Sequence, residues 1–87
     1  MKQLRLTHNA AVGYQRRLAP GQSINVAYHE LKRACVHGSY EQQPPKWLRK
    51  AHREAPEYLL LDGEVAALPI RNGRAIACLV NPLHAVR

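Results

Sequence analysis

Apolar residues recur every three or four positions over the first part of the chain, which is the spacing of one helix face. One such stripe covers residues 8–18 and follows Thr7, whose side chain can cap a helix. A second stripe covers residues 24–36 and follows Ser23, another good capping residue. Gly38 stands where a glycine commonly ends a helix. The pattern therefore predicts two amphipathic helices.

A third amphipathic segment begins at Pro45, a residue that suits the first position of a helix. Over residues 45–55 one face is apolar and the opposite face is basic, until Pro56 stops the pattern. The basic face consists of Lys46, Arg49, Lys50 and Arg53. We expect a third helix here, and we expect the polar stretch before it, residues 39–44, to form a loop.

After residue 56 the apolar period changes from about 3.6 to 2, which is the period of a β-strand. Strands are expected over residues 57–61, 64–70 and 74–80. The pairs Asp62-Gly63 and Asn72-Gly73 separate them and favour two-residue hairpin turns, because both turn residues need a positive φ. Pro69 cannot donate to a strand ladder, so we expect it near a strand end or at a bulge.

Helices followed by strands indicate one α+β domain over residues 1–87, with two or three N-terminal helices packed on a C-terminal three-stranded antiparallel meander. Residues 2–6 alternate polar and apolar positions and could add a fourth strand at one edge. The strands have too few polar positions for the second face of the sheet to be fully exposed. We expect the N-terminal strand, a helix or a second copy of the chain to cover that face.

Composition and charge narrow the classes of partner. The 87 residues include 13 Lys and Arg against 6 Asp and Glu, which gives a formal charge of +7. The excess lies in residues 1–53, whereas residues 54–87 hold three Arg against four acids. Charge sorted in this way is better evidence for an anionic partner than net charge alone.

Other classes of protein are not expected. No apolar run approaches the roughly 20 residues of a membrane span, and the N-terminus lacks the apolar stretch of a signal peptide, so we expect a cytoplasmic protein with no membrane partner. Cys35 and Cys78 are interpreted as small buried hydrophobic residues. No His or Cys pair has the spacing of two ligands for one metal, so neither a metal nor a cofactor is expected.

The remaining candidate chemistry is that of cations on phosphate. RNA cleavage without a metal needs a base, an acid and cations that stabilise the transition state. His8 is the candidate base because it follows Thr7 at a helix start, where the helix dipole favours a neutral imidazole. His84 is the candidate acid, and Arg17 is the candidate cation beside the phosphate.

Nucleic-acid binding is the second role that the cations suggest. The candidate binding residues are the basic face of the third segment and two cations on the outside of the second helix: Lys46, Arg49, Lys50, Arg53, Lys32 and Arg33. A basic face that is simply solvated is the alternative explanation of the same pattern.

Residues 7–18 read THNAAVGYQRRL. They resemble the first helix of a group of small bacterial and phage proteins, approximately T-x-H-A-x-x-R-Y-x-x-R, which is similar to the RelE-like toxins of the barnase-EndoU-colicin-RelE ribonuclease class. Four residues match the motif, namely Thr7, Ala10, Tyr14 and Arg17. The family histidine aligns with Asn9 and the first family arginine with Gly13. The resemblance implies N-terminal helices against an antiparallel meander, and ribonuclease activity.

We therefore expect a basic, RelE-like module that binds RNA or another nucleic acid. Weak metal-independent endoribonuclease activity is a further expectation for the same module. The alternative is a non-enzymatic phage or prophage protein that binds and modulates a host protein. An antitoxin is another expected partner. A second copy of the chain could also bind, through the sheet. A concave surface shared by the basic face and His8, Arg17 or His84 would favour the nuclease. Exposure of Trp47 and the strand leucines would favour protein binding.

Overall fold

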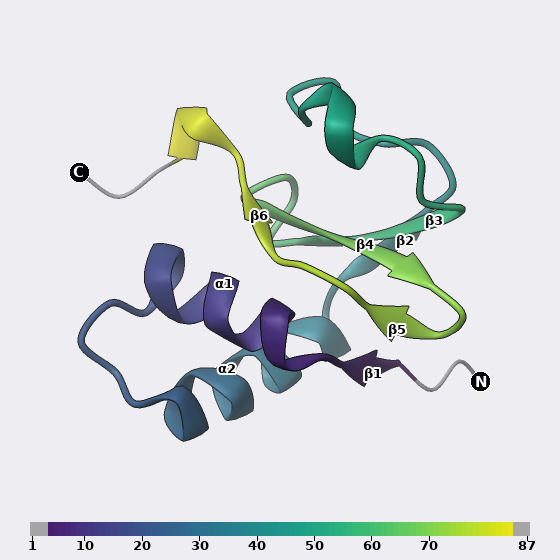
Figure 1. Cartoon of the computed structure of the whole chain (residues 1–87). Coiled ribbons are helices and arrows are strands. Elements are labelled where there is room, and N and C mark those ends of the chain that lie inside the picture. The colour runs from purple at the N-terminus through teal and green to yellow at the C-terminus, as the bar shows by residue number, and fades with distance from the viewer. Residues whose placement is uncertain (1–3, 85–87) are drawn as a thin grey trace.

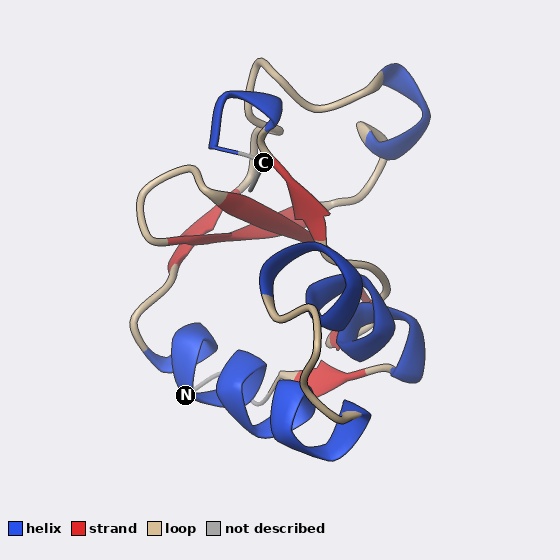
Figure 2. Cartoon of the chain, turned by 90° about the vertical axis from the view of Figure 1, so that its left-hand side faces the viewer, coloured by secondary structure: helices blue, strands red, loops and turns tan. Residues whose placement is uncertain are grey.

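The computed structural model describes residues 4–84 as helices on one face of a mixed sheet (Figures 1 and 2). The helices are α1 (His8–Leu18) and α2 (Ile24–Val36). The strands within the described residues are β1 (Arg5–Leu6), β2 (Ser39–Glu41), β3 (Glu57–Leu61), β4 (Ala66–Arg71), β5 (Arg74–Ala75) and β6 (Leu79–Val80). Their order is β1-β5-β4-β3-β2, and β6 also pairs with β4. The expected α+β class is confirmed.

Both helices begin where the sequence predicts, and their caps explain why. The Thr7 hydroxyl accepts a hydrogen bond from the Ala10 N–H, and the Ser23 hydroxyl accepts one from the Val26 N–H, each at 3.2 Å. Such bonds satisfy helix donors that have no partner within the helix. The Thr7 hydroxyl also donates to the Ala75 carbonyl at 2.7 Å, so it ties the start of α1 to β5.

The sheet is mixed, and the expected three-stranded antiparallel meander is not confirmed. β3 and β4 are antiparallel, and β5 returns along β4 after the two-residue turn Asn72-Gly73, with φ of 52° and 74°. β1 pairs parallel with β5, so an edge strand is present at residues 5 and 6, while residues 2 and 3 lie outside the described chain. β2 forms the opposite edge by pairing with β3, where the sequence predicted a loop. All three β2 residues are exposed, so no apolar alternation marks this strand.

The connection between β3 and β4 is longer than the expected two-residue turn. Leu61 pairs with Ala66, which leaves residues 62–65 in the loop. Asp62 and Gly63 do have positive φ values, 46° and 73°. The Val65 N–H donates to the Leu61 carbonyl at 3.1 Å and closes the wider loop.

The expected strand 74–80 is divided into β5 and β6 by a β-bulge. Residues 76–78 of this strand face only Leu68 and Pro69 of β4. The Ile76 N–H donates to the Pro69 carbonyl at 3.0 Å. The bulge lies opposite Pro69. This agrees with the expectation that Pro69, which has no N–H to donate, lies near a strand end or at a bulge.

The expected third helix, residues 45–55, does not form. This stretch contains a hydrogen-bonded turn, in which the Leu48 N–H donates to the Pro45 carbonyl, and then a short 3-10 helix, η1 (Lys50–His52). Arg49, immediately before it, is extended, with φ −64° and ψ 150°. An α-helix cannot continue through an extended residue, so the apolar and basic faces that the spacing predicted are not separated in the structure.

The side chain of Arg53 explains how this non-helical segment is held. Its guanidinium donates to the carbonyls of Pro45 at 2.8 Å and Leu48 at 3.2 Å, and to that of Lys46 at 3.5 Å. The Pro45 carbonyl also accepts from the Leu48 N–H at 3.1 Å, so the guanidinium reinforces a backbone turn that begins at Pro45. Arg53 is therefore a structural anchor of the segment.

The second face of the sheet is covered by residues 44–56, here called the cover segment (Figure 1). Tyr58 of β3 points to this face and is fully buried. Its hydroxyl donates to the His52 carbonyl at 3.0 Å and accepts from the Ala55 N–H at 3.1 Å. Neither the N-terminal strand nor a helix covers this face, since the residues above it belong to a loop.

The main core lies on the opposite face, between the sheet and the two helices. Its large members are Leu31, Leu59, Leu61, Leu68 and Ile70, with Ala10 and Cys78 beside them. The strand residues of this group are spaced two apart within β3 and β4, as expected for one face of a sheet.

Gly13 allows α1 to approach the bulge closely. A Cβ at this position would lie 2.8 Å from the Cys78 carbonyl oxygen, a backbone atom. Gly38 has a similar role at the end of α2, because a Cβ there would meet a Leu59 side-chain carbon at 2.6 Å. Its φ is not positive, so close packing rather than a left-handed helix cap requires this glycine.

We expect Gly13→Ala to lower the free energy of unfolding by about 1–3 kcal/mol, because the added methyl group collides with the Cys78 carbonyl. The same exchange at an uncrowded helix position stabilises by about 1 kcal/mol. Urea unfolding followed by circular dichroism measures the change. Asn9→Ala, at an exposed position of α1, is the control and should change stability by less than about 0.5 kcal/mol. Equal or greater stability of Gly13→Ala would contradict the close approach.

The two cysteines give a second prediction. Burial raises the pKa of Cys35 from 9.0 to about 11 and that of Cys78 from 9.0 to about 12. Because both folded pKa values lie above the unfolded value, the thiols favour the folded state below pH 9, and this contribution is lost as the pH rises through 11 to 12.

A disulfide reagent such as 5,5′-dithiobis(2-nitrobenzoic acid) should therefore react at least about 100-fold more slowly at pH 8 with the folded chain than with the chain in urea. Cys35, which is half-buried, should react before the buried Cys78. Equal rates for the folded and unfolded chains would show that the thiols are not buried.

Candidate nucleic-acid interface

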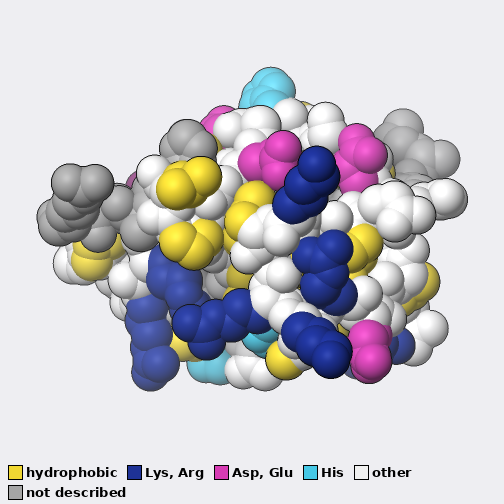
Figure 3. Space-filling model, turned by 90° about the horizontal axis from the view of Figure 1, so that it is seen from above, with side chains coloured by type: hydrophobic (Ala, Val, Ile, Leu, Met, Phe, Trp, Pro, Cys, Tyr) yellow, Lys and Arg dark blue, Asp and Glu magenta, His cyan; other side chains and the backbone are white. Residues whose placement is uncertain are grey.

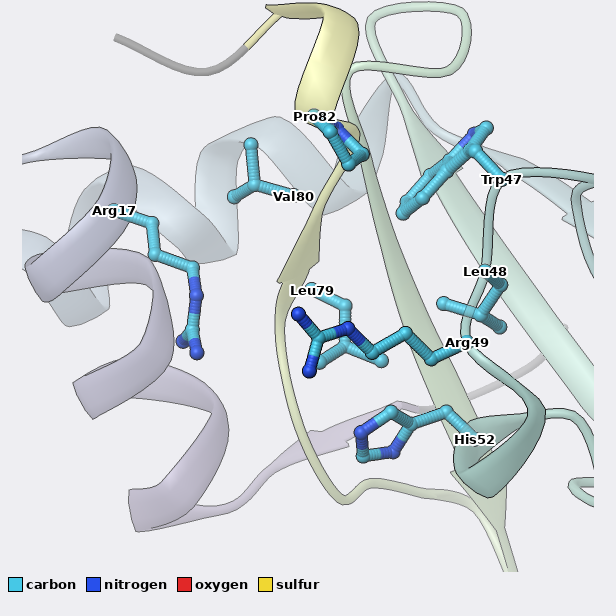
Figure 4. A pocket seen from close by; sticks show the side chains of 8 residues that line it. All are labelled: Arg17, Trp47, Leu48, Arg49, His52, Leu79, Val80 and Pro82. Atoms are coloured by element: carbon cyan, nitrogen blue, oxygen red, sulfur yellow. The ribbon is translucent and has the colours of Figure 1, made fainter. Parts of the chain in front are cut away.

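A shallow hollow of ≈ 220 Å³ opens where α1, β6 and the cover segment meet (Figure 4). Its lining residues are Arg17, Trp47, Leu48, Arg49, His52, Leu79, Val80 and Pro82. None of these lining residues is acidic. The hollow therefore combines three groups that can carry positive charge with an apolar remainder.

Each wall of the hollow comes from a different layer of the fold. α1 contributes Arg17 near its C-terminal end, and the close approach at Gly13 brings this helix to the strand region that contains β6. β6 contributes Leu79 and Val80. The cover segment contributes the opposite wall. Within it, the extended Arg49 lies between two turns.

The Arg49 guanidinium extends toward the middle of the hollow with the His52 ring beside it, and the Arg17 side chain runs along α1 on the opposite wall (Figure 4). Among the residues that the structure describes, no hydrogen bond or ion pair holds either guanidinium. Arg53 differs in this respect, because three carbonyls occupy its guanidinium. The donors of Arg17 and Arg49 thus remain open to a ligand.

The face that carries the cover segment has basic side chains with several acidic ones beside them (Figure 3). Figure 3 looks onto the face of the cover segment, where Lys and Arg side chains gather in two groups. Lys46 and Lys50 are exposed on the cover segment, on either side of Arg49 in the chain. A negatively charged ligand that enters the hollow therefore finds further cations nearby.

The structure divides the six residues predicted to bind nucleic acid. Arg49 lines the hollow, while Lys46 and Lys50 are exposed on the same segment. Arg53 is exposed, and its Nη1 donates to three carbonyls of the cover segment, so part of its guanidinium has a structural role while its assignment as a phosphate ligand stays a prediction. Lys32 and Arg33 are exposed on α2, in the helical layer on the other side of the sheet (Figure 1).

The structure places two of the three predicted catalytic side chains. Arg17 lines the hollow, but His8 is exposed at the first residue of α1, about 13 Å away along the helix axis at about 1.5 Å per residue. His84 ends a 3-10 turn, η2 (Pro82–His84), and its side chain is outside the described part of the structure. His8 is therefore not a lining residue of this hollow, and the catalytic assignment of these residues stays a prediction.

His52 is the lining residue that the sequence analysis missed. It follows Arg49 by three positions, a spacing that would have put both on one face of the expected helix. That spacing was the available signal. The pairing of Arg17 with Arg49 has no local signal, because it arises from the packing of α1 against the strands and the cover segment.

The described residues show neither a metal centre nor a membrane span. No group of three or more His, Cys, Asp or Glu side chains within residues 4–84 could hold a metal ion. No helix in that range has the length and apolar character needed to cross a bilayer.

Comparison of the chain with protein-family models, with curated proteins and with solved structures finds no match. The resemblance of residues 7–18 to RelE-like proteins therefore stays a prediction. The chemistry of the hollow is the basis on which a function can be assigned.

Proposed function

We propose that this protein binds nucleic acid, RNA in particular, and holds the phosphate backbone at the hollow between α1 and the cover segment. The observation that carries the proposal is the convergence of Arg17 and Arg49, from distant parts of the chain, on one hollow with no acidic lining residue. Guanidinium donors match the paired oxygens of a phosphate, which makes arginine the preferred residue for this contact.

Electrostatics supports an anionic occupant. Two cationic groups that face one hollow repel each other, and an anion between them replaces that repulsion with two attractions. The exposed Lys46 and Lys50 extend the positive surface beyond the hollow. A polyanion can contact all of these cations at once and releases its counterions when it binds, so it is favoured over a single small anion.

The strand leucines expected to carry the alternative function are buried, whereas Trp47 is only half-buried. Docking on a host protein or an antitoxin, or dimerisation through the sheet, was expected to use exposed strand leucines together with Trp47. Leu59, Leu61 and Leu68 have 2% exposure or less, and Trp47 is half-buried. The burial of these leucines counts against docking through the sheet, and the two arginines at the hollow remain the support for nucleic-acid binding.

RNA cleavage is a second candidate, and the position of His52 favours it. An imidazole beside two guanidinium groups can move a proton while the cations stabilise the charge of a pentavalent phosphate. His52 takes the place that the sequence analysis gave to His8.

The binding proposal predicts that Arg17→Ala and Arg49→Ala each weaken the binding of a fluorescein-labelled 12-nucleotide single-stranded RNA by about tenfold. Each lost phosphate contact should also flatten the slope of log affinity against log salt by nearly one unit. Fluorescence anisotropy at several salt concentrations measures both quantities.

Arg16→Ala is the matched control for Arg17→Ala, since it removes the same charge from the next residue of α1, outside the hollow. We expect it to change the affinity by less than about threefold. The proposal is wrong if Arg16→Ala and Arg17→Ala weaken binding equally, or if the parent protein does not bind RNA at low salt.

The cleavage candidate predicts that the parent protein cleaves labelled RNA in EDTA, and that His52→Ala slows cleavage at least about tenfold while RNA binding is retained. His29→Ala, on the exposed side of α2, is the control and should cleave at the parent rate. Intact RNA after prolonged incubation with the parent protein would leave binding as the function of the hollow.

A further inference from the structure

The hollow has two chemically different ends. Arg17, Arg49 and His52 occupy one end, and Trp47, Val80 and Pro82 stand at the other (Figure 4). Leu48 and Leu79 lie between them. An occupant that satisfies both ends carries an anionic group joined to a flat apolar group.

The size of the hollow limits how much of a ligand it can enclose. Its ≈ 220 Å³ is less than the roughly 300–1,000 Å³ of sites that enclose a small molecule. The occupant is therefore one part of a larger ligand, most of which stays on the surface. The exposed cations around the hollow are placed to hold the rest of such a chain when it is anionic.

We propose that the hollow receives one nucleotide of a single-stranded nucleic acid, with the base against Trp47 and an adjoining phosphate between Arg17 and Arg49. This inference rests on the proposed function and adds a selection for single strands to it. In a duplex the base is stacked between its neighbours and paired, so it cannot enter a hollow of this size, whereas an unpaired base can turn out of the strand.

Trp47 suits the contact with a base for two reasons. It is half-buried and lines the hollow, so part of the indole is open to a ligand. Its Nε1 is buried and has no acceptor among the described residues, so this donor is left for an acceptor on a ligand. Stacking on an aromatic side chain is tolerant of base identity, so we expect strand selection with little sequence preference.

Trp47 is the only tryptophan of the chain, so its fluorescence reports directly on the hollow. The probes are a 12-nucleotide oligouridylate, the 12-nucleotide oligothymidylate, a 12-base-pair RNA duplex and a polyglutamate of equal charge. We expect the single strands to quench the tryptophan emission, and the duplex to bind at least about tenfold more weakly than the oligouridylate. Equal binding of the two single strands would show that the site accepts DNA and RNA alike, and it would support the inference.

Two variants separate the base contact from the phosphate contact. Trp47→Leu keeps an apolar side chain without a ring and should weaken oligouridylate binding by about tenfold, with the salt slope unchanged. Trp47→Phe keeps a ring and should bind within about threefold of the parent. Circular dichroism and urea unfolding check that both variants fold, and anisotropy of labelled oligouridylate measures their binding.

The possible failures have different meanings. Duplex binding as tight as that of the single strand, or parent-like binding by a folded Trp47→Leu variant, would overturn this inference while the loss of binding in Arg17→Ala still supports the proposed function. Polyglutamate that binds as tightly as oligouridylate and quenches Trp47 equally would overturn it in favour of an acidic polypeptide. No binding of any nucleic acid would overturn both proposals.

Discussion

The Tyr58 hydroxyl bonds the sheet to the carbonyl of His52 and the amide of Ala55, and the cover segment depends on this buried contact. The segment has little regular structure of its own, so few backbone bonds hold it. The Arg53 guanidinium supplies a second fixed point by collecting the carbonyls around Pro45. Arg71 of β4 adds a third fixed point by donating to the Glu54 carbonyl at 2.9 Å, so side chains rather than a regular helix hold the segment over the second face of the sheet.

The hollow depends equally on the way α1 is attached. The Thr7 hydroxyl ties the start of the helix to β5, and Gly13 lets its middle approach the carbonyl of Cys78. The C-terminal end of α1 then brings Arg17 to the edge of the hollow, with β6 forming the wall between helix and cover segment. Two cations from opposite layers of the molecule consequently line the same hollow.

The sequence predicted features that short-range chemistry determines. The caps at Thr7 and Ser23 and the Asn72-Gly73 turn belong to this class, because each depends on residues only a few positions apart. The prediction of a third helix was wrong because the apolar and basic spacing carries no information about the extended backbone of Arg49. It also carries none about the hydrogen bonds from Arg53 to backbone carbonyls. β2 and the contact of Arg17 with the hollow were missed because both arise from tertiary packing.

The central claim is that Arg17 and Arg49 hold one phosphate together, and a double-mutant cycle on RNA binding tests it most directly. The affinities of the parent, Arg17→Ala, Arg49→Ala and the double variant for one single-stranded RNA give the interaction free energy between the two arginines. Residues that share a ligand group are expected to couple by about 0.5–3 kcal/mol, so the double variant should lose less than the two single losses combined. Losses that add to within about 0.3 kcal/mol would show that the two arginines act independently and would contradict the shared phosphate.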